Sequence, residues 1–463
     1  MEPRVDGSGV GFPHPKPTLS FWLQGTRNNA LIGHRTTEEV PSNADVVIIG
    51  AGMSGAATAY HLLKDHETTK GGLPKVVMLE AREVCYGATG RNGGHCKPDF
   101  YRGYPKYKKR FGKDEAMKIL QNEKETLALL TRVVEDEKID CDLWRGRAFD
   151  VALNEACAED FHAALQEFAA DGGEVDGIIE WISSPQEAKR RTRCVHAHAA
   201  AAYPTGSFWP YKFVTSLLRL CIDKYSLNVQ TDTPVLSVSR SGNGKWVVET
   251  ARGSVQAAKV VFGTNAYTST LLPEFTGKIV PVRGQCSVVI PTKAYSGERL
   301  LTHTYSLRWR MLDSDYLIQR PSDGAVIVGG GEWNAPLEDQ LGQTDDSVTH
   351  PAITKHLRNV CAKNFEGWGE EAQGEGLITD WTGIMGETPD SVPFVGELEE
   401  RRGCFICAGH NGHGMARIMS CARGVATLVS GGTWEDTGLP ECFKPTAGRI
   451  KNELQVRAEW AGF

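Results

Sequence analysis

The stretch Ala44-Asp-Val-Val-Ile-Ile-Gly50-Ala-Gly52-Met-Ser-Gly55 decides how this 463-residue chain folds. It opens with a β-branched, apolar run, which predicts a buried parallel strand. The three glycines follow at once, and Ala/Leu-rich sequence to about Lys64 predicts a helix. The first glycine permits a tight turn, the second lets the backbone approach a pyrophosphate, and the third permits close packing of the helix on the strand. The stretch therefore predicts a dinucleotide site at the helix N-terminus.

A second strand and the carboxylate that ends it extend this unit. Val76–Leu79 is another apolar run, and Glu80 follows it directly. A carboxylate at this position accepts hydrogen bonds from the ribose hydroxyls, which favours FAD or NAD over NADP. Glu80 lies further from the glycines than the usual spacing of about 20 residues. The polar insert 64–75 explains the difference, because it lengthens the connection.

A glycine-rich loop after this strand separates FAD from NAD. The segment Gly87-Ala-Thr-Gly-Arg-Asn-Gly-Gly-His95 is almost free of bulky side chains at its glycine positions. Such a backbone brings its amides close to a bulky planar or phosphorylated ligand. The polar residues interleaved with the glycines argue against a flexible linker. The loop therefore favours FAD.

Composition and charge exclude several classes of function. The chain has 51 Lys+Arg and 57 Asp+Glu, a formal net charge of −6, which argues against a nucleic-acid or anionic-membrane role. Its 50 glycines are many for an otherwise ordinary globular composition. The 12 cysteines are scattered, and residues 1–40 hold no apolar signal segment. We therefore expect an intracellular, cytoplasmic protein without a membrane span.

The rest of the chain alternates between helical and strand patterns. Apolar residues at helical spacing predict helices over 114–138, 155–170, 210–225, 350–365 and 415–430. Short β-rich runs predict strands over 235–238, 246–249, 259–262, 285–290, 316–319, 325–328 and 404–408. This order predicts a nucleotide-binding unit at the front, a mixed α/β middle and a closing strand–turn–helix unit.

Two further motifs have simpler interpretations than the sites that they suggest. Val326-Ile-Val-Gly-Gly-Gly331 lacks the third spaced glycine, since Asn334 stands there, and Pro336 cuts short any following helix. Without a second nucleotide site, the electrons should come from the substrate itself. Cys404-Phe-Ile-Cys407 lies on a predicted strand, which directs its two thiols to opposite faces. We expect core thiols there, and no metal site.

Several motifs, taken in order, resemble the D-amino-acid-oxidase-like superfamily of FAD-dependent oxidoreductases. The loop 87–95 is similar to the family's GASGRNGG loop. The other matching segments are 50–55 with Glu80, 260–267, 281–285, 381–396 and 408–415, which run in family order across about 45–430. Members include sarcosine, glycine, D-amino-acid and γ-glutamylputrescine oxidases. The arm before these segments resembles fungal members in particular.

The resemblance implies a fold of two domains. One is an α/β, Rossmann-like FAD-binding domain, and the other is an interleaved α+β substrate domain with a mixed or antiparallel sheet. The expected FAD-binding domain comprises 44–105, 205–282 and 376–440, and the expected substrate domain comprises 106–204 and 283–375. An N-terminal arm, 1–43, and a C-terminal tail, 441–463, complete the chain.

The resemblance also implies which residues hold FAD. The glycine turn would hold the pyrophosphate, Glu80 the AMP ribose and the backbone at Val235 the adenine. A helix start at 412–415 would face the flavin O2 edge, where it would stabilise the negative charge of reduced flavin. The expected FAD-binding residues are Gly50, Gly52, Met53, Ser54, Gly55, Glu80, Ala81, Arg82, Gly87, Ala88, Thr89, Arg91, Asn92, Gly93, Gly94, His95, Val235, Thr264, Asn265, Ala266, Gly386, His410, Asn411, Gly412, His413, Gly414 and Met415.

The chemistry of the family implies an amine or amino-acid oxidase. In that chemistry a hydride passes from the substrate α-carbon to flavin N5, water hydrolyses the imine, and O2 reoxidises the flavin to give hydrogen peroxide. We expect His95, Arg283, Trp381 and His413 at the catalytic site, with Arg283 as a candidate partner for a substrate carboxylate. Further pocket candidates are His303, Tyr305, Arg308, Trp309 and His410.

The sequence leaves the mode of FAD attachment and the electron acceptor open. Gly383, Ile384 and Met385 stand where sarcosine-oxidase-like members carry the linking cysteine, so we expect FAD to be bound non-covalently. One alternative is a dehydrogenase of the same fold that uses another acceptor, and another is an enzyme that oxidises a natural-product amine. A different class is a structural flavin-binding protein with an interaction role. The oligomeric state stays unknown.

Overall fold

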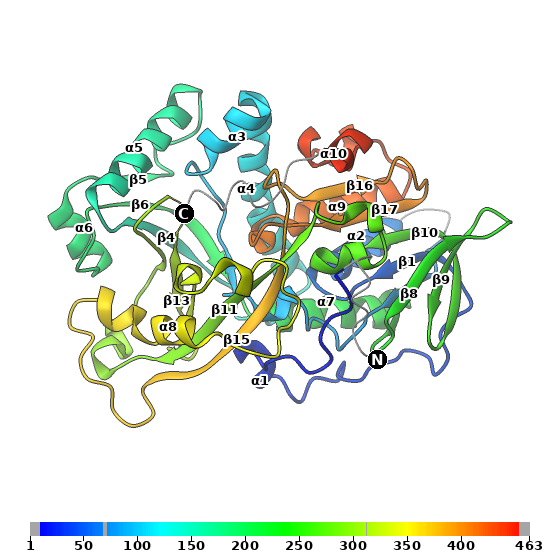
Figure 1. The fold of residues 1–463 in the computed structure, drawn as a ribbon, viewed down its shortest axis with the longest axis horizontal. Coiled ribbons are helices and arrows are strands. Elements are labelled where there is room, and N and C mark those ends of the chain that lie inside the picture. Colours follow the sequence, from blue (N-terminus) through cyan, green and yellow to red (C-terminus); the bar gives the residue numbers. More distant parts are fainter. Residues whose placement is uncertain (1–9, 68–71, 312, 453–463) are drawn as a thin grey trace.

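Two β-sheets and the helices that cover them make up the protein (Figure 1). The computed structural model describes residues 10–67, 72–311 and 313–452. Parts of the expected arm, of the expected insert 64–75 and of the expected tail therefore lie outside the described residues. In Figure 1 the sheet that contains β1 lies on the right, and the sheet that contains β4 and β6 lies on the left.

The first sheet is built around the strand that precedes the glycine turn. β1 (Asn43–Ile49) pairs in parallel with β10 (Gly253–Phe262) on one side and β2 (Val76–Leu79) on the other. The order is β16-β17-β10-β1-β2-β7, with β7 (Asn228–Gln230), β16 (Phe394–Glu397), β17 (Cys404–Ala408) and the attached antiparallel pair β8 (Val235–Arg240) and β9 (Trp246–Thr250). Helices pack on one face of the central strands and the β8–β9 pair packs on the other, which explains their Val/Ile runs without alternation. This sheet confirms the predicted Rossmann-like layer.

Helices on this sheet bring together segments that are far apart in the sequence. α2 (Met53–His66) packs against both α7 (Pro210–Tyr225) and α9 (Ile418–Val429). The long helix α4 (Lys113–Asp136) packs against α9 and against α3 (Tyr104–Phe111). A short helix, α10 (Ala447–Lys451), lies near the end of the described chain. The helices predicted over 114–138 and 210–225 are confirmed within a few residues at each end.

The second sheet has mixed strand directions, as the resemblance implies. Its order is β15-β11-β14-β13-β12-β4-β6-β3, with β5 beside β6. Its strands are β3 (His95–Cys96), β4 (Trp144–Ala152), β5 (Glu180–Ile182), β6 (Ala199–Ser207), β11 (Val280–Ile290), β12 (Thr304–Arg308), β13 (Asp315–Gln319), β14 (Val326–Gly329) and β15 (Gly376–Glu387). The β4–β12 pair is parallel and the other pairs are antiparallel. The covering helices are α5 (Glu155–Ala170), α6 (Pro185–Thr192) and α8 (Pro351–Asn364).

The structure differs from the sequence-based expectations at several elements. β3 and β15 belong to the second sheet, although we expected 44–105 and 376–440 in the FAD-binding domain. We did not predict β6, whose alanine run is typical of a helix but is held by pairing with both β4 and β5. The expected helix start at 412–415 is also wrong, because Gly414–Ala416 forms a 3₁₀ turn and α9 begins only at Ile418.

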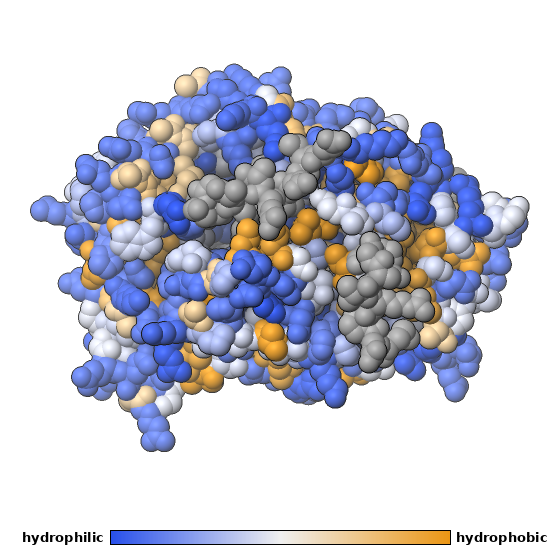
Figure 2. All heavy atoms as spheres, viewed as in Figure 1, coloured by the Kyte–Doolittle hydropathy of each residue, from blue (hydrophilic) through white to orange (hydrophobic). Residues whose placement is uncertain are grey.

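Most of the molecular face seen in Figure 2 is hydrophilic, with hydrophobic residues gathered near its middle. Among the described residues, no helix is both long enough and apolar enough to cross a membrane. All 12 cysteines are free, and all but Cys442 are buried. The thiols of Cys404 and Cys407 are core thiols, as expected.

The N-terminal arm is anchored by a buried tryptophan. The arm is mostly irregular, as expected, but it includes the short helix α1 (Phe21–Gln24). Trp22 is 1% exposed, and its indole Nε1 donates to the carbonyl of Asn92 at 2.6 Å. The indole of Trp209 donates to the carbonyl of Trp22 at 2.9 Å, and the two rings meet edge to face. The arm is therefore packed into the core rather than lying on the surface.

We predict that Trp22→Ala lowers the free energy of unfolding by about 3–5 kcal/mol, the usual cost of truncating a buried aromatic side chain. Chemical denaturation, monitored by far-UV circular dichroism rather than by tryptophan fluorescence, measures the change. Trp309→Ala is the matched control, because Trp309 is 44% exposed and surface substitutions usually change stability by about 0.5 kcal/mol or less. Equal effects of the two substitutions would contradict the anchoring role.

Candidate cofactor and substrate site

A single elongated cavity runs along the edge of the first sheet where β1, β2 and β10 end. It encloses about 1510 Å³ of space between protein atoms, part of it open to solvent. Its walls come from the start of α2, the loop after β2, the loop after β10, the middle of β11 and β15, and the segment 410–415. The residues that line it thus extend from the strand ends of the first sheet to the strands of the second sheet. The cavity suits a large, extended ligand such as a dinucleotide.

The glycine turn is tightly packed against the end of β10. Gly50 has φ +103°, and a Cβ there would lie 2.7 Å from the carbonyl oxygen of Gly263. Gly52 is the N-cap of α2, and as a glycine it has no side chain that could cap the helix. The Oγ1 of Thr89 accepts a hydrogen bond from the N–H of Met53 at 3.0 Å. The helix N-terminus is thus open to an anion, as a pyrophosphate site requires.

Glu80 lies on the cavity wall with its carboxylate held by backbone. Its two oxygens accept hydrogen bonds from the N–H of Ala51 at 2.8 Å and of Arg82 at 2.9 Å. Burial raises the pKa of this carboxyl, although the same backbone donors oppose the rise. A carboxylate has about four acceptor positions, so two remain for the hydroxyls of a ribose. The residues present therefore fit FAD at this end.

Most of the expected FAD-binding residues meet on the wall of this cavity. Val235, from β8, lies there although it is distant in sequence from the glycine turn. The expected residues that do not line the cavity are Gly55, Gly93, Gly94, His95, Ala266 and His413. Gly55 lies beneath the turn, where a side chain would collide with the carbonyl of Gly50. It serves the packing of α2 on β1 rather than ligand contact.

His410 is a buried, neutral group on the cavity wall. Its Nε2 lies 3.4 Å from the Oγ of Ser54 in the first turn of α2. Burial, aided by the charge of Arg417, lowers the pKa of His410 to about 3. The imidazole is therefore uncharged at neutral pH. It can exchange a hydrogen bond with a ligand without bringing a charge.

Arg283 does not face the cavity, which contradicts its expected role at the substrate. Neighbouring residues on a strand point to opposite faces, and Gly284 and Cys286 are the residues of β11 that line the cavity. The guanidinium of Arg283 donates instead to the carbonyl of Asp339 at 2.7 Å and to that of Asp345 at 3.2 Å. Arg283 therefore holds the loop after β14 in place.

Trp381 and His413 also lie outside the cavity wall. Trp381 is fully buried, and its indole donates to the carbonyl of Arg91 at 2.7 Å. His413 contacts Glu123 of α4, with 2.8 Å between Nε2 and Oε2. Glu123 also receives the guanidinium of Arg417 at 2.8 Å. Both expected catalytic residues therefore serve to join elements around the cavity.

His95 lies one layer behind the cavity wall, next to Tyr316. The two rings meet edge to face with centroids 5.6 Å apart. Burial lowers the pKa of His95 to about 4, so the ring is neutral. Tyr316 itself lines the cavity together with Cys286, and the phenol oxygen lies 3.3 Å from the thiol sulfur. His95 thus supports the residues that end the cavity.

The remaining pocket candidates lie elsewhere in the second sheet. His303 stacks on Phe149, Tyr305 packs on Phe149 and Phe365, and Trp309 is largely exposed. Arg308 is buried, and its Nη1 donates to the carbonyl of Met311 at 2.9 Å. None of these four residues lines the cavity.

Several residues of the cavity wall were missing from the sequence-based list. They include Gly11, Phe12 and Pro13 of the arm, Tyr267, Thr270 and Leu271 after β10, Gly284, Cys286 and Tyr316 of the second sheet, and Gly383, Ile384 and Met385 of β15. On the predicted strand 285–290, side-chain alternation alone places Cys286 and Gln285 on opposite faces of the sheet, but it does not say which face lines a cavity. No sequence signal places the arm beside the cavity, since it matches no nucleotide-binding motif.

Comparison with known proteins agrees with this cavity. The family model described as FAD dependent oxidoreductase (DAO) matches residues 45–428. The chain belongs to this family. It is an FAD-dependent oxidoreductase with FAD as its cofactor. The matched segment includes the glycine turn, Glu80 and the 410–415 segment, but it leaves out the arm.

Relatives of known name match most of the length of the chain. The probable oxidoreductase OrdL of Haemophilus influenzae is 24% identical over 90% of each chain, and γ-glutamylputrescine oxidoreductase of Escherichia coli is 24% identical over 84% of each. Glycine oxidase from Geobacillus kaustophilus is similar in structure, with a TM-score of 0.69 and 22% identity over 88% of this chain and 99% of its own. These relatives are bacterial, so the resemblance of the arm to fungal members stays a prediction.

We predict that Glu80→Gln weakens FAD binding by about 10- to 100-fold, because hydrogen bonds to a charged acceptor contribute about 1.5–3 kcal/mol each. Fluorescence titration of the apoprotein with FAD measures the dissociation constant. Glu83→Gln is the matched control, since Glu83 lies on the same loop, accepts from the N–H of Gly33 and does not line the cavity. Unchanged affinity in the Glu80 variant would refute the ribose assignment.

We predict that Glu123→Gln lowers the free energy of unfolding at neutral pH but has little effect near pH 2. Burial alone would raise the pKa of Glu123, but His413 and Arg417 lower it to about 2, against 4.5 without a fold. A carboxyl with a lowered folded-state pKa stabilises the protein above pH 4.5, and this stabilisation is lost as the pH falls towards 2. A shift of this size corresponds to about 3 kcal/mol.

Denaturation curves of wild type and Glu123→Gln between pH 2 and pH 7 test this. The two free energies of unfolding should converge at the acidic end of that range. A difference independent of pH would show that the ion pairs around Glu123 do not carry the effect.

Proposed function

We propose that this protein oxidises a C–N bond of an amine or amino acid. The observation that carries the proposal is the continuity of the FAD cavity with the second sheet. The cavity extends from Glu80 and the start of α2 to Gly284, Cys286 and Tyr316. A small molecule bound at that end would contact both the flavin-binding elements and the substrate sheet. When bound, FAD supplies the acceptor for a hydride from the substrate and a route for the electrons to O2, which yields hydrogen peroxide.

The groups at the substrate end favour a neutral amine. Burial raises the pKa of the Cys286 thiol to about 12 and raises that of the Tyr316 phenol well above its ordinary value. Both groups therefore stay uncharged at neutral pH, as do His95 and His410. An uncharged, buried surrounding disfavours an ammonium ion. These residues would exclude water and orient the neutral amine without acting as a strong base.

The lining residues favour amines over α-amino acids within this class. Among the described residues, the arginines that line the cavity are Arg82 and Arg91, and both face Asp346. Arg283, our expected carboxylate partner, points to the other face of β11. A substrate carboxylate would thus meet no guanidinium at the Cys286–Tyr316 end.

Non-covalent FAD is part of the proposal. Two thiols beside the FAD-binding segments could link to the flavin, Cys96 after the 87–95 loop and Cys407 before the 408–415 segment; both are buried, and burial raises the pKa of both. A thiol held in its protonated form is a poor nucleophile. Acid precipitation distinguishes covalent from non-covalent FAD, because a colourless protein pellet means that the FAD was not covalently bound. An intracellular location and O2 as electron acceptor complete the proposed function.

We predict that an amine reduces the flavin of the purified protein faster than the α-amino acid with the same side chain. Anaerobic mixing with such matched pairs measures the rate at which the yellow colour bleaches. Peroxide on readmission of air indicates an oxidase, whereas bleaching without peroxide indicates a dehydrogenase. Faster reduction by the amino acids would overturn the preference for amines. If neither class reduces the flavin, the proposed function itself fails.

A further inference from the structure

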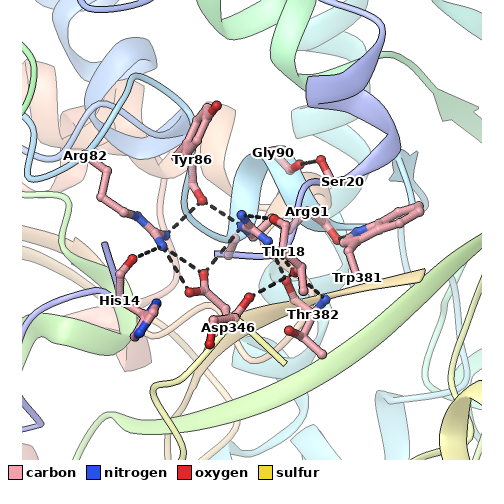
Figure 3. A network of polar contacts seen from close by, with 12 residues as sticks. His14, Thr18, Ser20, Arg82, Tyr86, Gly90, Arg91, Asp346, Trp381 and Thr382 are labelled. Carbon is pink, nitrogen blue, oxygen red and sulfur yellow. Dashed lines mark hydrogen bonds and ion pairs between the residues drawn. The ribbon is translucent and has the colours of Figure 1, made fainter. Parts of the chain in front are cut away.

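A buried aspartate of the second domain lies between two arginines of the FAD-binding loop (Figure 3). The side chain of Asp346 is 1% exposed, and its two oxygens lie 3.0 and 3.1 Å from Nη1 of Arg82. Its Oδ2 also lies 3.5 Å from Nε of Arg91. The carbonyl of Tyr86 accepts a further hydrogen bond from each arginine, at 2.9 and 2.8 Å. One carboxylate thus faces two guanidinium groups.

Every nitrogen of the Arg91 guanidinium is occupied within the protein. Besides the bond from Nε to Tyr86, Nη1 donates to the carbonyl of Thr382 at 2.8 Å and to Oγ1 of Thr18 at 3.1 Å. Its Nη2 donates to the carbonyl of Thr18 at 2.6 Å. Burial lowers the pKa of Arg91 to about 10, and Asp346 opposes this fall. Arg91 therefore joins the FAD-binding loop, the arm and β15 rather than reaching out to a ligand.

The arm is bound to the backbone carbonyl of the same aspartate. The N–H and the hydroxyl of Thr18 both donate to the carbonyl of Asp346, at 2.7 and 2.9 Å. Further along the arm, Arg82 donates to the carbonyl of His14 at 3.0 Å. Thr270 donates to the carbonyl of Gly11 at 2.6 Å. Residues 11–18 therefore follow the rim of the cavity between the loop after β10 and the FAD-binding loop.

We propose that Asp346 and arm residues 11–18 form a clasp that retains FAD. Gly11, Phe12 and Pro13 line the cavity that holds the cofactor, although they lie outside the part of the chain that the family model matches. Asp346 is a positioning residue in this clasp, because it acts through Arg82, Arg91 and Thr18. The inference depends on FAD binding alone, and it holds whichever substrate the enzyme oxidises.

Charge and burial explain why the clasp is cooperative. A buried ion pair that loses one partner leaves an uncompensated charge, which is strongly destabilising. Without the Asp346 carboxylate, Arg82 and Arg91 would be two buried cations beside each other, and the loop whose backbone carbonyl accepts from Thr18 would lose its ion pairs to them. The arm and Asp346 therefore leave their places together. In their absence the rim of the cavity between Gly11 and Arg82 would open to solvent, and FAD could escape.

The test measures FAD release from the holoenzyme, with no substrate present. Asp346→Asn keeps the shape of the side chain and removes its charge. We expect FAD to dissociate at least about tenfold faster from this variant than from wild type. The rise in flavin fluorescence on release measures the rate of dissociation. Asp390→Asn is the matched control. It breaks a comparable pair with Arg449, at 2.6 Å and mostly buried, that lies outside the clasp and the cavity wall.

Two further measurements separate the clasp from a general loss of stability. Phe12→Ala changes a side chain that is 42% exposed and lines the cavity, so it should speed FAD release without altering the stability of the apoprotein. Limited proteolysis should cut the arm of Asp346→Asn faster than that of Asp390→Asn. Wild-type release rates in both Asp346→Asn and Phe12→Ala would overturn the proposal. Equal acceleration by Asp390→Asn would overturn it as well. If Asp346→Asn does not fold, the release rate of Phe12→Ala alone tests the proposal, and a wild-type rate in that variant overturns it.

Discussion

The close approach of two glycine backbones is the constraint on which the rest of the structure depends. The turn at Gly50 lies against Gly263, with no room for a Cβ between them. The N–H of Gly50 donates to Leu79, and that of Gly263 donates to Ile49. The ends of β1, β2 and β10 therefore meet within one hydrogen-bonded turn. Because the helix N-terminus, Glu80 and the loop after β10 all start from this point, the cavity for an extended dinucleotide follows from it.

Sequence reasoning worked where local pattern and tertiary role agree. The turn around Gly50 and helices such as α5 are encoded by motif and periodicity. β6 and the turn at 414–416 were not predictable, because partners remote in sequence set their conformation. β6 is an alanine run that becomes a strand only between β4 and β5. The arm at 11–13 carries no motif, and only the folded chain shows that it lines the cavity.

Motif matching placed the candidate catalytic residues near the right elements but could not give the direction of their side chains. Arg283 is one residue away from Gly284 on the same strand, and this single step turns it to the opposite face. His413 is close to His410 in sequence, yet it contacts Glu123, whereas His410 lines the cavity. A resemblance indicates which segments surround a ligand. The alternation of a strand and the partners of each side chain decide which residues reach it.

Two of the misplaced candidates, Arg283 and Trp381, have related roles in the structure. Arg283 holds the carbonyl of Asp345, next to Asp346, and Trp381 holds the carbonyl of Arg91. Both therefore support the ion pairs through which Asp346 joins the second domain to the FAD-binding loop. A residue that supports a positioning residue must keep its hydrogen-bond geometry, so few other side chains could replace it. The polar groups around the flavin loop thus act mainly on one another, and the surface left for the substrate is largely uncharged.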